Sequence, residues 1–262
     1  MNQIRQPAVA GMFYPADKQL LIRDIHEYLD QVKIEQDSVP KALVVPHAGY
    51  MYSGPIAASA YKQLIPVKDK IKRVILFGPS HRVAFHGLAA PQVDFFNTPL
   101  GNIAIDHQTI EQVADLPQVI LSDQAHLQEH SLEVQLPFLQ EILSDFSLVP
   151  FVVGEADRFE VAEVIEKLWG DEDTLIVIST DLSHYHSYNE AKQMDQDTSD
   201  AIVNLKPEQI EYDDACGRNG LNGMITVAEE KQLVADILDL RNSGDTAGDK
   251  SRVVGYGAYV FH

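Results

Sequence analysis

The segment Leu43-Val44-Val45-Pro46-His47-Ala48-Gly49-Tyr50 decides how we expect this chain to fold. Its apolar residues, starting at Ala42, predict a short buried strand that ends at Pro46. A histidine, His47, follows the strand directly, and glycines at 49 and 54 would let the backbone turn tightly beside its imidazole. The segment therefore predicts an imidazole held at the end of a core strand.

Two later segments repeat this arrangement. Apolar residues 74–77 are followed by Gly-Pro-Ser and His81, and apolar residues 175–178 are followed by Ser-Thr, Asp181 and then His184. If these strands lie parallel in one sheet, their carboxyl ends share one edge, where the ligand sites of open α/β sheets form. We therefore expect several imidazoles to meet at that edge.

The order of the expected elements predicts one α/β domain over residues 1–262, with a central, mostly parallel or mixed sheet and helices on both faces. The chain opens with helix, strand, helix, strand, which favours a parallel pair of strands joined by a right-handed crossover. We expect helices over 20–32, 55–65, 107–118, 124–144, 157–169 and 187–204, a short helix over 207–215, and one or two helices over 220–240. We expect strands over 42–46, 73–77, 147–153, 174–180 and 252–262, and short, partly antiparallel strands over 87–90, 93–96 and 102–105.

Composition excludes several classes of function. The formal net charge of −19 argues against binding to nucleic acid or to an anionic membrane surface. A single cysteine rules out an internal disulfide and suits a cytoplasmic protein. The first residues do not form a signal peptide, and no segment approaches the roughly 20 apolar residues of a membrane helix. We therefore expect a cytoplasmic protein without a nucleic-acid or membrane partner.

The chemistry of the expected site points to a metal. His47, His81 and Cys216 offer two imidazoles and a thiol, a mixed nitrogen and sulfur set that suits iron, copper or zinc. Cys216 lies in a glycine-rich turn before an expected helix, whose N-terminus would favour the thiolate together with the nearby Arg218. Three protein ligands would leave a position open for water or substrate.

Other polar residues near these segments have several interpretations. Asp181 and His184 suit metal ligands, groups that orient a ligand, or a general acid and base. His130 and Glu133 would lie one turn apart on the same face of a helix, a weak signal for a place in the cleft. Tyr50 suits an aromatic pocket wall.

At these residues the chain resembles the Memo family, known in bacteria and archaea as protein B of the AmmeMemoRadiSam system. The matching pieces are Ala10-Gly11-Met12-Phe13-Tyr14-Pro15, Pro46-His47-Ala48-Gly49-Tyr50, Gly78-Pro79-Ser80-His81, Glu129-His130-Ser131-Leu132-Glu133, Ser179-Thr180-Asp181-Leu182-Ser183-His184 and Cys216-Gly217-Arg218. They occur in the family's order and cover essentially the whole chain.

The resemblance implies a fold similar to that of class III extradiol dioxygenases, which hold non-haem Fe(II) with two histidines and a carboxylate. His47 and His81 match the two imidazole ligands, and His184 matches the acid/base or a further ligand. Cys216 stands where those enzymes supply a carboxylate, so ring cleavage does not follow from the likeness. The resemblance also implies a functional link to a radical-SAM protein.

Three hypotheses follow. The first is an Fe(II)-dependent oxidoreductase, with zinc or copper as other metals, in which His47, His81 and Cys216 hold the ion. His184 and Asp181 would move and orient a proton, and a small organic substrate would meet Tyr50, His130, Glu133 and Arg218. The second is a protein that binds a peptide or a metal in the same cleft without turnover. The third is a thiol hydrolase in which His184 and Asp181 activate Cys216.

Overall fold

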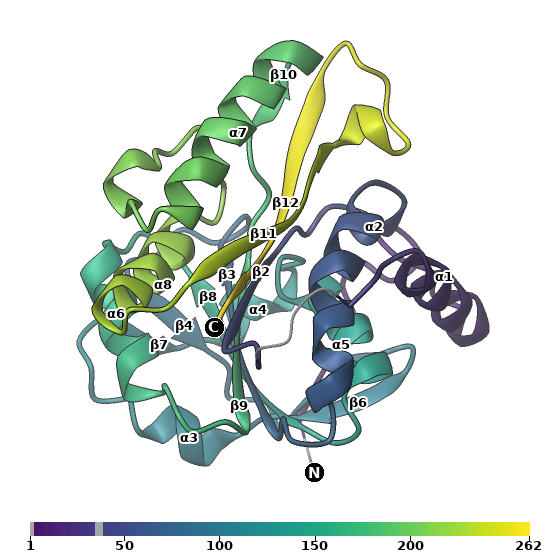
Figure 1. The fold of residues 1–262 in the computed structure, drawn as a ribbon. Helices are drawn as coiled ribbons and strands as arrows, with labels where there is room; N and C mark the ends of the chain where they lie inside the picture. The colour runs from purple at the N-terminus through teal and green to yellow at the C-terminus, as the bar shows by residue number, and fades with distance from the viewer. Residues whose placement is uncertain (1–2, 35–38) are drawn as a thin grey trace.

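One large mixed sheet forms the centre of the computed structural model, which describes residues 3–34 and 39–262. Its strands are β2 (Ala42–Val45), β3 (Arg73–Pro79), β4 (Leu88–Ala90), β7 (Val119–Leu121), β8 (Ser147–Val153), β9 (Thr174–Ser179), β10 (His184–His186), β11 (Ala235–Asn242) and β12 (Val253–Phe261). Their spatial order is β10-β12-β2-β9-β3-β8-β4-β7, and β11 pairs with β12 (Figure 1). The predicted class, an α/β domain with a mixed sheet between helices, is confirmed.

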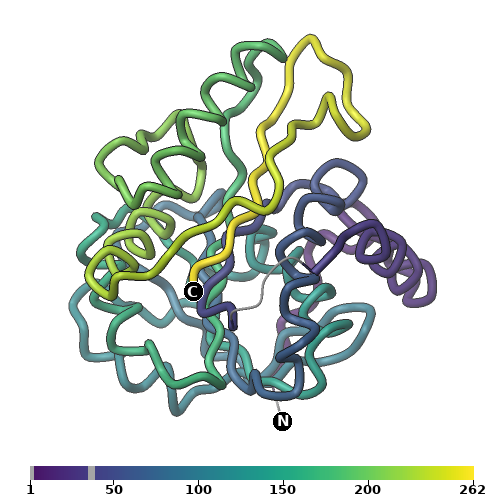
Figure 2. Tube along the Cα trace, in the orientation of Figure 1, coloured from purple at the N-terminus to yellow at the C-terminus, as the bar shows by residue number. Residues whose placement is uncertain are grey.

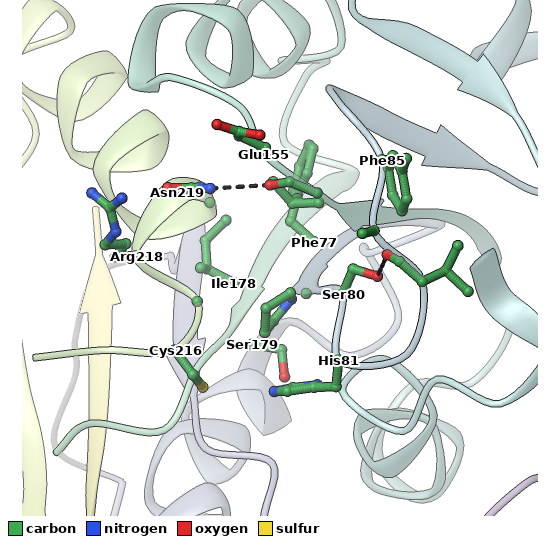
Figure 3. A pocket seen from close by; sticks show the side chains of 18 of the residues that line it. Phe77, Ser80, His81, Phe85, Glu155, Ile178, Ser179, Cys216, Arg218 and Asn219 are labelled. Atoms are coloured by element: carbon green, nitrogen blue, oxygen red, sulfur yellow. Dashed lines mark hydrogen bonds between the residues drawn. The ribbon is translucent and has the colours of Figure 1, made fainter. Parts of the chain in front are cut away.

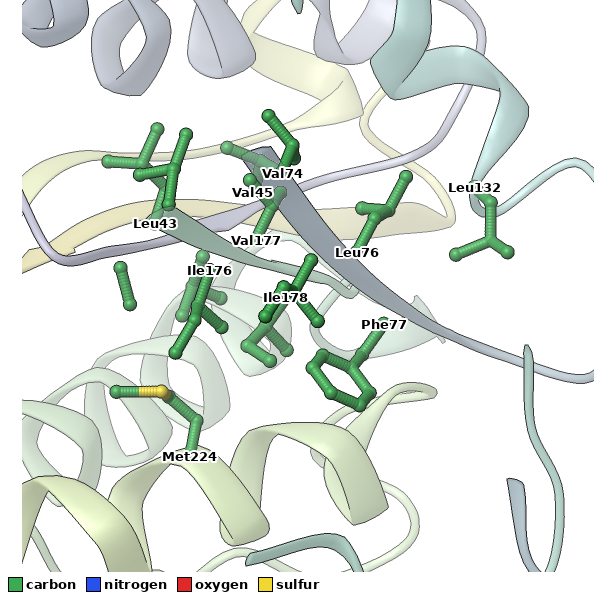
Figure 4. Close-up of a cluster of buried hydrophobic side chains, with 14 of the residues drawn as sticks. Leu43, Val45, Val74, Leu76, Phe77, Leu132, Ile176, Val177, Ile178 and Met224 are labelled. Atoms are coloured by element: carbon green, nitrogen blue, oxygen red, sulfur yellow. The ribbon is translucent and has the colours of Figure 1, made fainter. Parts of the chain in front are cut away.

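The four central strands, β2, β9, β3 and β8, run parallel to one another. Their apolar runs are buried on both faces, as expected of parallel strands covered by helices on each side. Figure 4 shows Leu76 and Val177 on one face of the sheet, and Phe77 and Ile178 on the other face with Met224. The expected parallel relation of β2 and β3 is correct, but β9 lies between them.

The helices lie in two groups on either side of the sheet (Figure 1). One group contains α1 (Lys18–Asp30), α2 (Tyr50–Tyr61) and α5 (Leu136–Ile142), and the other contains α6 (Arg158–Lys167) and α8 (Arg218–Glu230). The helix α7 (Tyr188–Val203) packs against β11 and β12. Figure 2 shows the last strand, drawn in yellow, beside β2 from the early part of the chain, with which it pairs antiparallel.

Parallel and antiparallel pairs of short strands complete the periphery. The strands β1 (Ile4–Arg5), β5 (Phe95–Thr98) and β6 (Gly101–Ala104) form a separate three-stranded sheet. In it β5 and β6 pair antiparallel, as the short apolar runs predicted. At the other end of the large sheet, β10 brings His184 to an edge position beside β12.

Several expected elements were wrong in extent or type. The segment 124–144 is not one helix but α4 (Asp123–Leu127), a 3₁₀ turn at Glu133–Gln135 and α5. It is interrupted because the Glu129 carboxylate accepts the amides of His130 and Ser131, which an α-helix would bond to carbonyls.

Residues 235–240 belong to β11 rather than to a helix, because they pair along almost the full length of β12. The expected helix over 107–118 is only α3 (His107–Glu111), and the one over 207–215 is a 3₁₀ turn at Pro207–Gln209. The helix α2 begins five residues before Pro55, with Gly49 as its N-cap, and Gly54 lies inside it rather than in a turn.

Candidate metal centre

The His47 imidazole is fixed at the carboxyl end of β2 with one free nitrogen. Its Nδ1 lies 2.9 Å from Oγ of Ser179, at the end of β9. The single Ser179 hydroxyl proton goes to the Ser131 carbonyl at 2.6 Å, so Ser179 can only accept from the ring. Nδ1 therefore carries the proton, and Nε2 presents its lone pair. An amide proton of Gln135 also donates to Ser179 Oγ, at 2.8 Å, which fixes the hydroxyl further.

The His81 imidazole, after β3, is fixed in the same sense by Glu129. Its Nδ1 lies 2.9 Å from Oε1 of this carboxylate, which can only accept, so Nδ1 carries a proton and Nε2 is the nitrogen left to bind a metal. Glu129 is buried and accepts the backbone amides of His81, His130 and Ser131 as well. Burial raises the pKa of Glu129, but the bonds from His81 and the amides outweigh it and lower the pKa to about 2.

The sulfur of Cys216 meets these nitrogens from the turn before α8. Its Sγ lies 3.3 Å from Nε2 of His47. The turn is bound to the end of β9, because the Cys216 amide donates to the Asp181 carbonyl and the Gly217 amide donates to Thr180 Oγ1 at 2.8 Å. Figure 3 shows the Cys216 and His81 side chains near each other at one end of a pocket.

Ligand atoms of His47, His81 and Cys216 all lie within 4.8 Å of one another. Ligands at about 2.0–2.3 Å from a shared tetrahedral ion lie about 3.5 Å apart, so a small closure suffices to coordinate a metal. The two imidazoles, each fixed by an acceptor at Nδ1, match the arrangement usual behind metal-ligating histidines. The residues present therefore fit a metal ion.

Ligand atoms of a second group also lie within 4.8 Å of one another, those of His81, Glu129 and His130. It shares His81 with the first group, but its carboxylate already accepts four N–H groups. The His130 ring packs 4.6 Å from that of His81 and 5.5 Å from that of His47, between centroids. His130 therefore belongs to the cluster of imidazoles, and burial lowers its pKa to about 4.

The expected thiolate at Cys216 is wrong for the protein without metal. Burial, followed by the charge of Asp181, raises the pKa of the thiol to about 12. The guanidinium of Arg218 does not reach the sulfur but lies over the Tyr212 ring, 5.6 Å from its centroid. Because a coordinating thiol loses its proton outright, the metal itself would have to supply the stabilisation that we expected from Arg218.

We had expected Asp181 to orient His184, but it does not. Its carboxylate accepts the backbone amide of His47 at 2.7 Å and thereby holds the chain at the end of β2 against the end of β9. Burial raises the pKa of Asp181 to about 7, although the amides of His47 and Ala48 oppose the shift. Its carboxyl group serves to position a ligand.

Among the described residues, ring contacts join His47, His81 and His130, whereas the His184 ring contacts Tyr185. Burial lowers the pKa of His184, a hydrogen bond to the Leu182 carbonyl raises it, and the neighbouring charge of His81 lowers it. The charge of His184 in turn lowers the pKa of His47, so the two rings interact electrostatically. His184 is therefore neutral near pH 7.

Two residues expected in the cleft lie in its supporting framework instead. The Glu133 carboxylate is fully buried and is occupied by Arg5 at 2.7 Å, by Tyr14 and by two backbone amides. The Tyr50 hydroxyl donates to the Val134 carbonyl at 2.7 Å, and only 5 % of the residue is exposed. Contact of Glu133 or Tyr50 with a substrate does not fit this geometry.

A pocket of about 680 Å³ adjoins two of the three candidate ligands, His81 and Cys216 (Figure 3). His81, Ser179, Cys216 and Arg218 line it, with apolar walls that include Phe77 and Ile178. The sequence analysis missed Ser179 and assigned no role to Glu129, the two residues that fix the imidazoles. Both stand inside the segments that we had singled out, but only their contacts with the two rings reveal the role.

The described helices include none that is long and apolar enough to cross a membrane. Among solved structures, an uncharacterized protein, JW3007, from Escherichia coli K12 has a similar fold, with a TM-score of 0.50 and 15 % identity over 84 % of this chain and 99 % of that one.

Comparison with known sequences gives a much stronger likeness. A MEMO1 family protein of Aquifex aeolicus is 37 % identical over 99 % of both chains. Those of Ignicoccus hospitalis and Methanosarcina mazei are 36 % and 34 % identical, each over 98 % of this chain, and over 98 % and 99 % of the relative. The model of the Memo-like protein family matches residues 5–260. This chain therefore belongs to the Memo-like family.

Proposed function

We propose that this protein binds one Fe(II) ion through Nε2 of His47, Nε2 of His81 and Sγ of Cys216, and acts as an oxidoreductase on a small organic substrate. The observation that carries the proposal is the pair of fixed imidazoles whose free nitrogens meet one sulfur, with 3.3 Å between Sγ and Nε2 of His47. Two imidazoles and a thiolate suit iron, zinc and copper. The resemblance to class III extradiol dioxygenases favours iron.

The bound ion would supply one-electron redox chemistry and an open coordination position. The chain's own residues do the rest. We assign the acid and base role to His184, because burial lowers its pKa and leaves a neutral ring at pH 7 that can accept a proton.

The surroundings support selective binding of a small molecule. A volume of about 680 Å³ lies within the usual range for small-ligand sites, and apolar side chains such as Phe77 and Ile178 reduce the access of water. Asp181 and Glu129 hold the backbones of His47 and His81 in place, so the ligands are positioned before a metal binds. The functional link to a radical-SAM protein stays a prediction from the resemblance.

The test is an anaerobic titration of the chelator-treated protein with Fe(II), Zn(II) and Cu(I). We expect one Fe(II) per chain, and a loss of affinity of at least about a hundredfold in His47→Ala and Cys216→Ala. His107→Ala, which changes a histidine at the start of α3, is the matched control and should bind as the unchanged protein does. A sulfur-to-metal charge-transfer band that disappears in Cys216→Ala would identify the thiolate ligand.

Oxygen consumption with a panel of small organic substrates then separates an enzyme from a binding protein. Uptake that depends on Fe(II) and on His184 supports the oxidoreductase. Stoichiometric metal binding without oxygen uptake by any substrate would favour a non-catalytic metal- or ligand-binding protein. If Fe(II) does not bind, or if His47→Ala binds it equally well, the proposal is overturned.

A further inference from the structure

The guanidinium of Arg218 has no anionic partner in the described part of the chain. Its Nε is buried without a hydrogen-bond acceptor, and no carboxylate of residues 3–34 or 39–262 makes an ion pair with it. The guanidinium lies over the face of Tyr212, 5.6 Å from the ring centroid. By contrast, the buried Arg5 has a carboxylate at 2.7 Å and two backbone carbonyls. A buried donor without an acceptor costs stability unless a ligand completes it.

This absence stands out because of the overall charge. The chain has 39 acidic residues and only 20 lysines and arginines, so carboxylates are abundant. Glu155 lines the same pocket, yet it does not pair with Arg218. Figure 3 shows the two side chains extending from different elements on one side of the pocket, with Cys216 and His81 on the other.

The pocket between these groups suits the body of a small apolar molecule. Its wall between the two ends includes Phe77, Phe85 and Val153. Cys216, His81 and Arg218 line this same pocket, so one small molecule bound in it can meet all three residues.

We infer that the substrate is a small apolar molecule carrying one carboxylate, which Arg218 binds while the opposite end of the molecule faces His81 and Cys216. The place of that opposite end rests on the proposed function, whereas the anion contact rests on Arg218 alone. A planar guanidinium pairs with a carboxylate through two parallel hydrogen bonds. A single cation beside Glu155, in a chain of net charge −19, favours a monoanion over a doubly charged phosphate.

The test uses the full chain after chelator treatment, so that no metal is needed. Calorimetry or ligand-observed NMR compares 3-phenylpropanoate with its neutral amide and with phenyl phosphate. We expect the carboxylate to bind at least about tenfold more tightly than the amide. Arg218→Gln should abolish this preference, and Arg218→Lys should keep part of it.

Arg158→Gln is the matched control, because it removes the same charge from an arginine that pairs with Glu208 and lines a neighbouring cavity. It should leave the preference unchanged, and thermal unfolding of each variant confirms that it is folded. Equal binding of acid and amide, or a preference that survives in Arg218→Gln, overturns the inference. Tighter binding of phenyl phosphate than of the carboxylate overturns the assigned class.

The outcome is separate from that of the metal proposal. His47→Ala should lose the metal but keep the preference for the carboxylate, since Arg218 is intact. A protein that binds Fe(II) without preferring the acid keeps the proposed function and loses this inference. The reverse result keeps the anion site and removes the metal chemistry.

Discussion

Sγ of Cys216 lies 3.3 Å from Nε2 of His47, although 169 residues separate them in the sequence. Because Nδ1 of His47 donates to Ser179, Nε2 can only accept, and the neutral thiol is the donor in this contact. A metal ion bound here would take the place of that thiol proton. In the protein without metal, this hydrogen bond thus holds the Cys216 and His47 side chains together at the place where both would bind the ion.

The hydroxyl of Ser179 is predicted to control metal affinity without touching the metal. Ser179→Ala removes the acceptor that fixes the His47 tautomer, so we expect affinity for Fe(II) to fall by about 10- to 100-fold. Competition with a coloured chelator measures the change. Ser144→Ala, at an exposed serine, is the control, and equal affinities in the two variants would contradict the assigned role.

The turn that carries Cys216 is predicted to tolerate no side chain at Gly217. A Cβ there would lie 2.6 Å from the Ser179 carbonyl oxygen and 2.7 Å from Cβ of Thr180. Gly217→Ala must therefore push the turn away from β9, with an expected cost of about 1–3 kcal/mol in the free energy of unfolding and weaker metal binding.

Gly220→Ala is the matched change for this prediction. Its Cβ would meet only ordinary contacts, the nearest at 3.7 Å from Ile178, and alanine favours the helix by up to about 1 kcal/mol. Chemical denaturation and metal titration of both variants check the difference. If Gly217→Ala binds metal as tightly as Gly220→Ala, the turn does not set the position of the sulfur.

The ion pair of Arg5 and Glu133 is predicted to be structural. Both side chains are almost fully buried, so Glu133→Gln leaves an uncompensated guanidinium and should lower the free energy of unfolding by about 3–5 kcal/mol. Glu27→Gln, which breaks an exposed pair with Arg23, should change it by no more than about 1 kcal/mol. Urea denaturation distinguishes the two, and a Glu133→Gln protein of unchanged stability would refute the framework role.

A buried carboxyl outside the metal centre is predicted to make stability depend on pH. Asp195 on α7 is 2 % exposed and accepts the Ser183 amide at 3.0 Å. Burial raises its pKa from 3.8 to about 6. Between these values the folded chain keeps a proton that the unfolded chain has released, so stability should fall as the pH rises from about 4 to about 6.

Asp195→Asn removes this titration. We expect the variant to gain stability relative to the unchanged protein as the pH rises through that window, by roughly 2–3 kcal/mol in all. Asp197→Asn, at an exposed position of the same helix, should show no such trend. Unfolding free energies measured across the window decide, and a difference that is constant with pH would contradict the prediction.

Local sequence patterns were sufficient for the parts of the molecule in which neighbours along the chain decide the structure. The helix expected over 20–32 was found as α1, because its apolar residues recur at helical spacing and the Asp17 side chain caps the Leu20 amide. The apolar run before His47 could only be a buried strand. Two features could not be predicted from helical spacing. The helix is interrupted near Glu129 because its carboxylate accepts backbone amides, and residues 235–242 form a strand because they pair with β12.

The sequence by itself determined that three apolar strands end in His47, His81 and the Asp181–His184 segment, since strand periodicity and chain breaks are local properties. Only the tertiary structure decided that β9 lies between β2 and β3, so that Ser179 reaches His47 while the turn before α8 delivers Cys216. Tautomers, the raised thiol pKa and the unpaired Arg218 depend on which groups meet in space and how much water they lose. No spacing along the chain encodes those distances.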